Sequence, residues 1–396
     1  MSQLHLAVAL DGAGWHPAAW RVHRPAILTA GWWAGLVAEA ERGLLDFVTV
    51  EDSLAPPSEL PGVPVDRADR VRARLDAAVI AARVAPLTTH IGIVPTVTTT
   101  HTEPFHIASA IATLDYVSTG RAGWRAQVSA RQAEATHVGR RTVPALHTAR
   151  PDRIAEVVRP LFDEAADVIE VVRRLWDSWE DDAIIRDVAT GRFVDNRKLH
   201  YVDFEGEWFS VKGPSIVPRP PQGQPLVTVL GHATVPYLLG VRGADVLYVT
   251  PDSGAHAAAV VSEVRASERA EGRDGVPLRI FGDLVVFLDP EPGAAARRKR
   301  ELDDLDGAEL TSDAFVFTGT PGELADLLVE WRAAGLDGFR LRPGVLPDDL
   351  TLIARELTAR LRERGLFRSA YPGTTLRETL GLSRPASRYA VAGGAA

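Results

Sequence analysis

The feature that most constrains this chain is a repeated alternation of short apolar runs with segments of helical periodicity. Mainly apolar runs of strand length lie at residues 4–10, 46–50, 90–95, 226–230, 245–250 and 279–288. Two further predicted strands, at 121–129 and 338–342, mix apolar residues with arginines. This many strand–helix units favour a closed barrel, because an open sheet rarely contains eight consecutive crossovers. We therefore predict an α/β fold, a (β/α)8 TIM-type barrel that residues 1–396 form as a single domain.

The segments between the runs predict the helices and two additions to the barrel. Apolar residues at spacings of three and four predict helices at 32–42, 69–83, 104–117, 152–179, 235–241, 255–271, 321–334 and 349–364. Alternating residues around Glu205-Gly206 predict a hairpin insertion at 198–212, and a C-terminal extension follows the last helix. The proline-rich stretch 55–65 is expected to form a surface loop, and residues 130–150 an irregular segment.

Composition excludes several classes of protein. The formal net charge of −8 argues against a nucleic-acid-binding protein, which usually carries a basic face. The absence of cysteine excludes disulfides, thiolate metal sites and a cysteine nucleophile. No apolar run approaches the roughly 18 residues that a membrane helix needs, and Asp11 ends the first apolar run too early for a signal peptide. A cytoplasmic protein that binds neither membrane nor nucleic acid is the economical expectation.

Polar and aromatic residues gather where the predicted strands end. They are Trp15 and His16, Glu51 and Asp52, and the residues at 96–101, 125–129, 231–234, 250 and 340–342. The carboxyl ends of barrel strands meet at one mouth, where the sites of such barrels lie. We therefore predict that side chains distant in sequence converge on one pocket.

Common catalytic motifs are absent from the sequence. It contains no glycine-rich phosphate loop of the P-loop or Rossmann type and no G-x-S-x-G nucleophile elbow. His90, His101 and His106 lack the i, i+4 spacing of helical metal ligands, so we predict no metal site. The pattern alone predicts a barrel enzyme without defining its chemistry.

Several segments together resemble a known family. They are WHPAAWR (15–21), EPFHIASAIATLDYVSTGRAGW (103–124), LWDSWEDDAI (175–184), KLHYVDFEGEWFSVKGPSIVPRPPQGQP (198–225), DGFRL (337–341) and RGLFRSAYPGTTLRETLGL (364–382). The chain resembles the bacterial luciferase-like flavin monooxygenases. It is most similar to the branch of nitrilotriacetate monooxygenase, pristinamycin synthase and dibenzothiophene sulfone monooxygenase. The resemblance implies a TIM-type barrel, in agreement with the strand count.

The resemblance also implies an activity. A separate flavin reductase would supply reduced FMN, FMNH2, which reacts with O2 to give a C4a-peroxide that oxygenates a small organic substrate. Such barrels commonly pair, so a homodimer or higher homo-oligomer is expected. By this resemblance His16 is the candidate catalytic contact, and the candidate walls of the substrate pocket are Trp15, Trp20, Trp124 and His101. The candidate cofactor-binding residues are Asp52, Thr96, Arg125, Ser129, Gly231, Ala233 and Thr234.

The sequence departs from the family at the flavin phosphate. The family strand end G-W-N-x-V-T-S reads GWRAQVS here, with Arg125 in place of Asn. In the family a glycine-and-serine loop is expected to hold the phosphate. The matching loop here carries Ala233 in place of Ser and Pro236, which lacks an N–H, in place of Gly. A family Arg-Tyr pair, also a phosphate contact, aligns with Leu161-Phe162.

These departures leave alternatives open. Arg125 can replace the lost phosphate ligands with a guanidinium fork, assisted by His232, Thr234 and Arg242. Alternatively, Arg125 and Arg121 pair with Glu51, Asp52 or Asp115 and fill a vacated site. The chain is accordingly expected to be an FMNH2-dependent monooxygenase with an atypical phosphate site. The alternatives are a deazaflavin-dependent oxidoreductase or a non-catalytic luciferase-like partner without cofactor.

Overall fold

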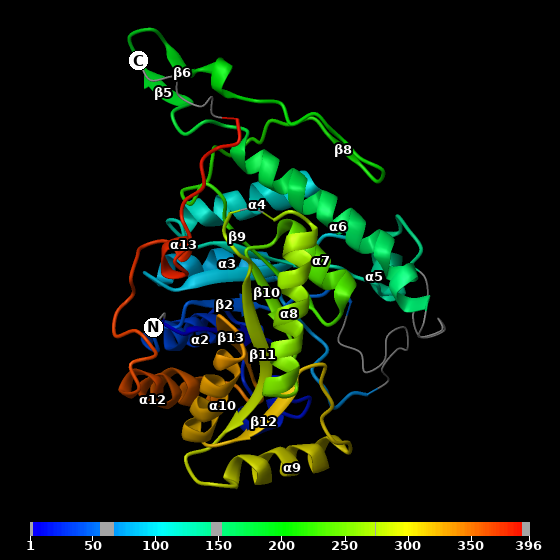
Figure 1. Cartoon of the computed structure of the whole chain (residues 1–396), viewed down its shortest axis with the longest axis vertical. Coiled ribbons are helices and arrows are strands. Elements are labelled where there is room, and N and C mark those ends of the chain that lie inside the picture. The colour runs from blue at the N-terminus through cyan, green and yellow to red at the C-terminus, as the bar shows by residue number, and fades with distance from the viewer. Residues whose placement is uncertain (1–2, 56–66, 144–152, 274, 390–396) are drawn as a thin grey trace.

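Eight parallel strands close into a barrel, as the apolar runs predicted. The computed structural model describes residues 3–55, 67–143, 153–273 and 275–389. Around the barrel the strands follow the order β1 (His5–Leu10), β2 (Phe47–Val50), β3 (Gly92–Thr98), β4 (Gly123–Gln127), β9 (Leu226–Gly231), β10 (Val246–Val249), β11 (Arg279–Leu288) and β13 (Gly338–Pro343). Parallel pairing of β13 with β1 closes the ring. The fold is a TIM-type barrel (Figure 1).

Helices cover the outside of the barrel. They are α2 (Ala30–Arg42), α3 (Ala77–Val84), α4 (Pro104–Val117), α6 (Ile154–Asp177), α7 (Thr234–Gly243), α8 (Gly254–Ala270) and α10 (Pro321–Ala333). After β13 the chain continues through α11 (Asp348–Leu352), a π-helical turn (Ile353–Leu357) and α12 (Thr358–Glu363). Side chains alternate along each strand, so Leu6 and Val8 pack in the large cluster shared with the helices, while Ala7 belongs to the smaller cluster of the barrel interior.

The C-terminal extension closes the amino-terminal end of the barrel. The short helix α13 (Leu376–Thr379) brings Leu376 and Leu380 into the interior cluster beside Phe47. Gly92, the first residue of β3, leaves room for this segment, because a Cβ there would lie 2.5 Å from a methyl carbon of Leu376. This end of the barrel is therefore filled, and the opposite end, where the strands finish, is left for a site.

Two hairpins form the insertion between α6 and β9. The predicted hairpin at 198–212 is confirmed as β7 (Phe204–Glu205) paired with β8 (Ser210–Val211). A second hairpin, β5 (Ile184–Asp187) with β6 (Arg192–Val194), was not predicted. Both project beyond α6 at the top of Figure 1. Further unpredicted elements are α5 (Gln132–Val138), α9 (Ala294–Asp306) and β12 (Phe315–Gly319), which pairs with the second half of β11.

One predicted helix is wrong over half its length. The helix expected at 69–83 begins only at Ala77, where the Asp76 side chain accepts the N–H of Val79 as an N-cap. In the preceding segment, Arg74 pairs with Asp11 over a long sequence distance. This tertiary ion pair outweighs the local helical periodicity. Parts of three other expectations, at 56–65, 144–150 and 152, lie outside the described residues.

No described helix combines the length and the apolar character needed to cross a membrane.

Candidate functional site

A buried ion network lies at the mouth of the barrel, where the strands end. Arg125, on β4, places Nη1 3.1 Å from Oε2 of Glu51, the residue that follows β2. The other carboxylate oxygen of Glu51 lies 2.9 Å from Nη1 of Arg340, on β13. Arg340 also contacts Asp283 of β11, with Nη2 2.6 Å from Oδ2. Glu51, Arg125 and Arg340 thus converge at one mouth as predicted, and Asp283 joins them without having been predicted.

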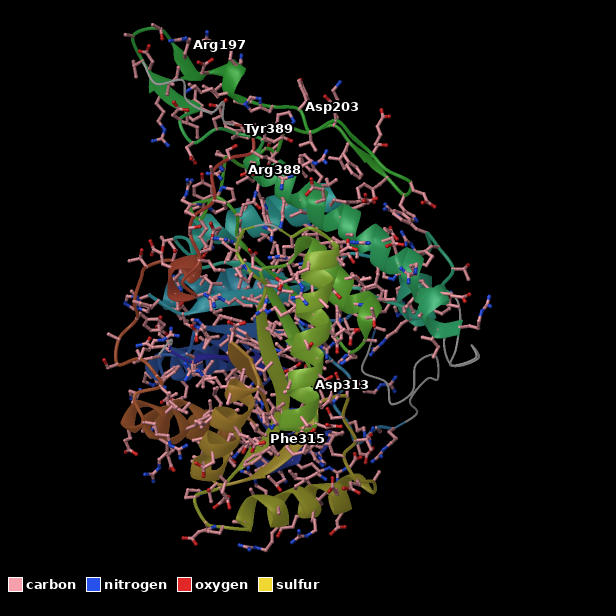
Figure 2. All side chains as sticks on the ribbon, viewed as in Figure 1. Arg197, Asp203, Asp313, Phe315, Arg388 and Tyr389 are labelled. Carbon is pink, nitrogen blue, oxygen red and sulfur yellow. The ribbon has the colours of Figure 1, made fainter. Side chains whose placement is uncertain are left out.

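The network continues toward β12. Arg342 pairs with Asp283 and, at 2.7 Å, with Asp313, which lies in the segment leading into β12 near Phe315 (Figure 2). Asp313 is 3.3 Å from Nε2 of His232, whose Nδ1 lies 2.9 Å from the Thr250 hydroxyl. The ends of β9, β10 and β13 therefore meet through one chain of contacts.

The arginines keep the buried carboxylates of this network ionised. Burial alone would raise the pKa of Glu51, but Arg125 and Arg340 hold that pKa below its usual value. Burial likewise opposes ionisation of Asp283, and Arg340 and Arg342 lower its pKa in the same way. The guanidinium of Arg340 also lies over the Tyr248 ring, 4.4 Å from its centroid. The mouth of the barrel therefore has a buried floor of paired charges.

Two adjoining cavities open above this floor. The larger, of about 780 Å³, has aromatic walls formed by Trp15, Trp20 and Trp33. The smaller, of about 310 Å³, lies against Glu51, Asp52, Ser129 and Glu134. Asp11, Arg74 and Arg131 line both cavities and mark their junction. The larger cavity has the size and aromatic lining typical of sites for organic ligands.

His16 is fixed by the protein at both ring nitrogens. Its Nδ1 accepts the N–H of Ala18 at 3.0 Å, so the proton of the neutral ring is assigned to Nε2. Nε2 then donates to Asp303 at 3.1 Å, and burial lowers the pKa of the imidazole. The side chain lines the larger cavity with its ring nitrogens occupied. This geometry suits a positioning role better than proton transfer.

The other predicted pocket walls divide into two groups. Trp15 and Trp20 line the larger cavity, and the guanidinium of Arg342 lies 5.0 Å from the Trp15 ring. Trp124 is fully buried in the layer between sheet and helices, where its indole N–H donates to the Val97 carbonyl. His101 lines a separate small pocket beside Glu164. The structure thus places Trp124 and His101 away from the two cavities.

The predicted cofactor residues are likewise distributed over several places. Asp52 lines the smaller cavity and accepts the backbone N–H groups of Ser53 and Ala77. The Thr96 hydroxyl accepts a hydrogen bond from Arg125, inside the ion network. Ser129 is buried beside the smaller cavity. None of these contacts reaches the loop between β9 and α7, where Gly231, Ala233 and Thr234 lie.

The side chains around the loop between β9 and α7 are engaged with other groups of the protein. A phosphate needs N–H, hydroxyl or cationic donors, but the Thr234 hydroxyl donates to the carboxylate of Glu263 at 2.6 Å. Arg242 is paired with Glu271 and Asp163. Ala233 caps the helix without a side-chain hydrogen bond. Near this loop, the carboxylate of Glu263 would repel a phosphate. The hydroxyl of Thr234 and the guanidinium of Arg242 already bind carboxylates of the protein.

The guanidinium of Arg125 is engaged in the ion network. It is buried against Glu51 and Thr96, as the alternative expectation proposed. The companion expectation for Arg121 is wrong, because its guanidinium donates to the Ser118, Ile91 and Ala85 carbonyls. Arg121 therefore ties β4 to the neighbouring helix ends and has no part in the site.

Several residues of this site were not predicted from the sequence. Asp283 stands inside the apolar run of β11, and a lone charge in such a run is a usable signal. Asp313 and Glu134 lie in elements that were not predicted, β12 with its approach and α5. Arg74 was assigned to a helix and instead reaches Asp11 from a segment without regular secondary structure.

The barrel and the two cavities at its mouth are typical of TIM-barrel enzymes. Comparison with known proteins identifies the family. The family model for luciferase-like monooxygenases matches residues 33–305. The chain belongs to this family and is thus an oxidoreductase, as its sequence resemblance indicated.

Full-length relatives support this assignment. N-acetyl-S-(2-succino)cysteine monooxygenase of Bacillus subtilis is 31% identical, and nitrilotriacetate monooxygenase component A of Aminobacter aminovorans is 30% identical. Each alignment covers 98% of both chains. A riboflavin lyase solved with modified FMN and its substrate riboflavin superposes with a TM-score of 0.83 at 25% identity, covering 98% of both chains. The predicted branch is confirmed.

Proposed function

We propose that this chain is the oxygenase of a two-component flavin monooxygenase, which receives reduced flavin from a separate reductase and oxygenates a small organic substrate. The observation that carries the proposal is the pair of cavities at the barrel mouth of a member of this family. A relative named as component A of a monooxygenase is consistent with a separate reductase. A bound reduced flavin supplies the electrons that activate O2.

In this proposal the residues of the chain bind and orient the flavin and the substrate, and they exclude water from the site. Trp15, Trp20 and Trp33 offer flat apolar surfaces for a ring system and limit the access of water to it. The ion network below them holds Trp15 through Arg342. His16 fixes the loop after β1 through Ala18 and Asp303.

The flavin phosphate is proposed to bind without the usual contacts at the start of α7. Two contacts support this proposal. The Thr234 hydroxyl donates a hydrogen bond to the carboxylate of Glu263, and Arg125 forms an ion pair with Glu51. An anchored phosphate would add charge-assisted hydrogen bonds and so make FMN bind more tightly than riboflavin. Without that anchor, the ring supplies the affinity and the two flavins bind alike.

Titration of the purified chain with FMN, FMNH2, riboflavin and a deazaflavin tests the proposal. We expect FMN and riboflavin to bind at tens of micromolar or better, with dissociation constants within about threefold of each other. A tenfold or greater preference for FMN would contradict the atypical phosphate site alone. Failure of FMN, FMNH2 and riboflavin to bind would contradict the flavin-dependent function, and tighter binding of the deazaflavin would favour the second type of cofactor.

A non-catalytic partner of a related barrel is the second candidate. The observation that favours it is the occupation of the barrel mouth by paired charges, with both nitrogens of His16 engaged. Such a partner would co-purify with an intact homologous barrel. Oxygenase turnover by the isolated chain, supplied with reduced flavin, would exclude it.

A further inference from the structure

One carboxylate joins two segments that line the larger, aromatic cavity. The first segment is the loop after β1, with Trp15 and His16, and the second connects α9 to β12 and carries Leu310. Asp303, in the last turn of α9, has a side chain that is 13% exposed. Its Oδ1 accepts the N–H of Leu310 at 2.8 Å and the Nε2–H of His16 at 3.1 Å. A single oxygen atom therefore binds one donor from each wall of the cavity.

The two walls also share apolar packing, which is less selective. Trp15 and Leu310 pack against the same buried cluster, which includes Phe287. Apolar contact is not directional, so it draws the two segments together without defining their separation. Hydrogen bonds from nitrogen hold donor and acceptor within about 2.7–3.2 Å of each other, and they weaken steeply when misaligned. The two bonds to Asp303 are therefore the contacts that define the spacing.

The carboxylate of Asp303 is itself held in place by its helix. Lys299, one turn earlier on α9, places Nζ 2.8 Å from the second oxygen, Oδ2. This ion pair compensates the charge and leaves Oδ1 to the two walls. At the end of the same helix, Asp306 pairs with Arg70, which also lines the cavity. The last turn of α9 is thus anchored, and Asp303 projects from a fixed point.

We propose that Asp303 is a positioning residue, which sets the spacing between the two walls of the aromatic cavity through the Leu310 N–H and the His16 imidazole. The inference rests on the proposed function in that the ligand held between these walls is the flavin. A small misplacement of groups that hold a ligand has large effects, because binding depends on close contact with the ring. The spacing of the walls exists without flavin, so it is testable separately.

Amide hydrogen exchange of the flavin-free chain tests the spacing, and titration with FMN tests its consequence. Asp303→Ala leaves both donors without their acceptor. We expect exchange to become about tenfold faster in both segments, 14–21 and 307–313, and the dissociation constant for FMN to rise about tenfold. Asp303→Asn keeps an oxygen for both donors and loses only the ion pair with Lys299. Both quantities should then stay within about threefold of their native values.

Two further variants sharpen the test. Asp304→Ala removes the exposed carboxylate next to Asp303 on the same helix, so it is the matched control and should change neither quantity. His16→Phe keeps the test valid if Asp303→Ala fails to fold, because it removes one donor and keeps an aromatic ring beside Phe287. We expect it to speed exchange in 14–21 while 307–313 stays protected.

Several results would overturn the inference. They are unchanged exchange of either segment in Asp303→Ala, an equal effect of Asp304→Ala, and losses in Asp303→Asn as large as those in Asp303→Ala. Equal FMN affinity in all variants would also overturn it, while the flavin-dependent function would stand. If exchange responds as expected but the native chain binds no flavin, the positioning role stands and the proposed function fails.

Discussion

At the scale of single residues, the barrel mouth depends on complete charge compensation. Arg125, Arg340 and Arg342 face Glu51, Asp283 and Asp313, and Arg340 contacts two of these carboxylates. Removing one partner of a buried pair leaves an uncompensated charge, which costs far more than the pair contributes. Arg340, with no exposed surface, is the residue on which the network depends most.

Replacement of Arg340 by Met should therefore destabilise the protein strongly. We expect Arg340→Met to lower the free energy of unfolding by about 3–5 kcal/mol, as measured by denaturant titration. Arg42→Met, which removes a mostly exposed partner of Glu39, should cost less than about 1 kcal/mol. If both variants lost less than about 1 kcal/mol of unfolding free energy, the claim that the buried network depends on Arg340 would be contradicted.

The lowered pKa of Asp245 predicts how the free energy of unfolding changes at acidic pH. Burial opposes its ionisation, but Arg173 and Arg377 lower its pKa to about 2 from the usual 3.8. A lowered carboxylate pKa stabilises the folded state above the unfolded value, so this contribution is present above pH 4 and lost as the pH falls toward 2. The contribution is about 2 kcal/mol. Asp245→Asn should reduce the acid sensitivity of unfolding by this amount, and an unchanged pH profile would contradict the assignment.

The strand-end residues could be predicted from sequence, but their partners could not. The alternation of apolar runs placed Glu51, Arg125 and Arg340 at one mouth, because strand order alone determines that edge. That Arg125 contacts Glu51 depends on side-chain directions, which sequence spacing does not define. The direction of the Trp124 side chain was likewise not predicted. Neighbouring side chains on a strand point to opposite faces, so Trp124 faces the helices while Arg125 faces the barrel interior.

At the scale of elements, strands were predicted well and helix starts less well. Six of the eight barrel strands follow mainly apolar runs, because a parallel strand buried on both faces needs them. The other two, β4 and β13, carry the arginines of the ion network. β12 was missed since its residues are only half-buried and it pairs along one edge of β11. The start of α3 was misplaced because Arg74 serves a distant partner, Asp11.

The loop after β1 is the element on which the aromatic cavity depends most. Its backbone binds the end of β13, through Trp15 N–H to the Pro343 carbonyl and His16 N–H to the Gly344 carbonyl. Gly14 makes this approach possible with a φ of +126° and no side chain, since a Cβ there would lie 2.5 Å from the Gly344 oxygen.

Gly14→Ala should displace Trp15 and His16 together. We expect flavin affinity to fall at least tenfold, because the aromatic wall moves with the loop. Gly12→Ala is the matched control: its φ is also positive, but a Cβ there meets no atom within 4 Å, so only a strain of about 1–2 kcal/mol is added. Titration of both variants with FMN, alongside their melting temperatures, separates loop displacement from general instability. Equal affinities in the two variants would contradict the role of this loop.

At the scale of the whole molecule, the projecting hairpins present apolar side chains to the surroundings. Val188 is 94% exposed and Phe193 62% exposed on the β5–β6 hairpin. The insertion contacts the C-terminal segment, which passes close to it at Tyr389 (Figure 2). There, His200 stacks on Tyr389 with ring centroids 5.1 Å apart. Exposed apolar groups on an extended arm are typical of contacts between chains.

The expected homo-oligomer should therefore depend on this hairpin. Light scattering should give the native chain a mass of at least two copies of 42.8 kDa. The double variant Val188→Ser, Phe193→Ser should give a lower mass with an unchanged melting temperature, because neither side chain packs in the core. A native monomer, or an oligomer unaffected by both substitutions, would contradict this expectation.

The most direct test of the proposed flavin site is a crystal structure of the chain soaked with FMN. We predict density for the flavin ring in the cavity lined by Trp15, Trp20 and Trp33, with Arg125 still paired with Glu51 and the phosphate away from the start of α7. A phosphate bound by residues 231–234, with Thr234 released from Glu263, would contradict the atypical phosphate site. Density for the ring outside this cavity would contradict the central claim that the cavity is the flavin site.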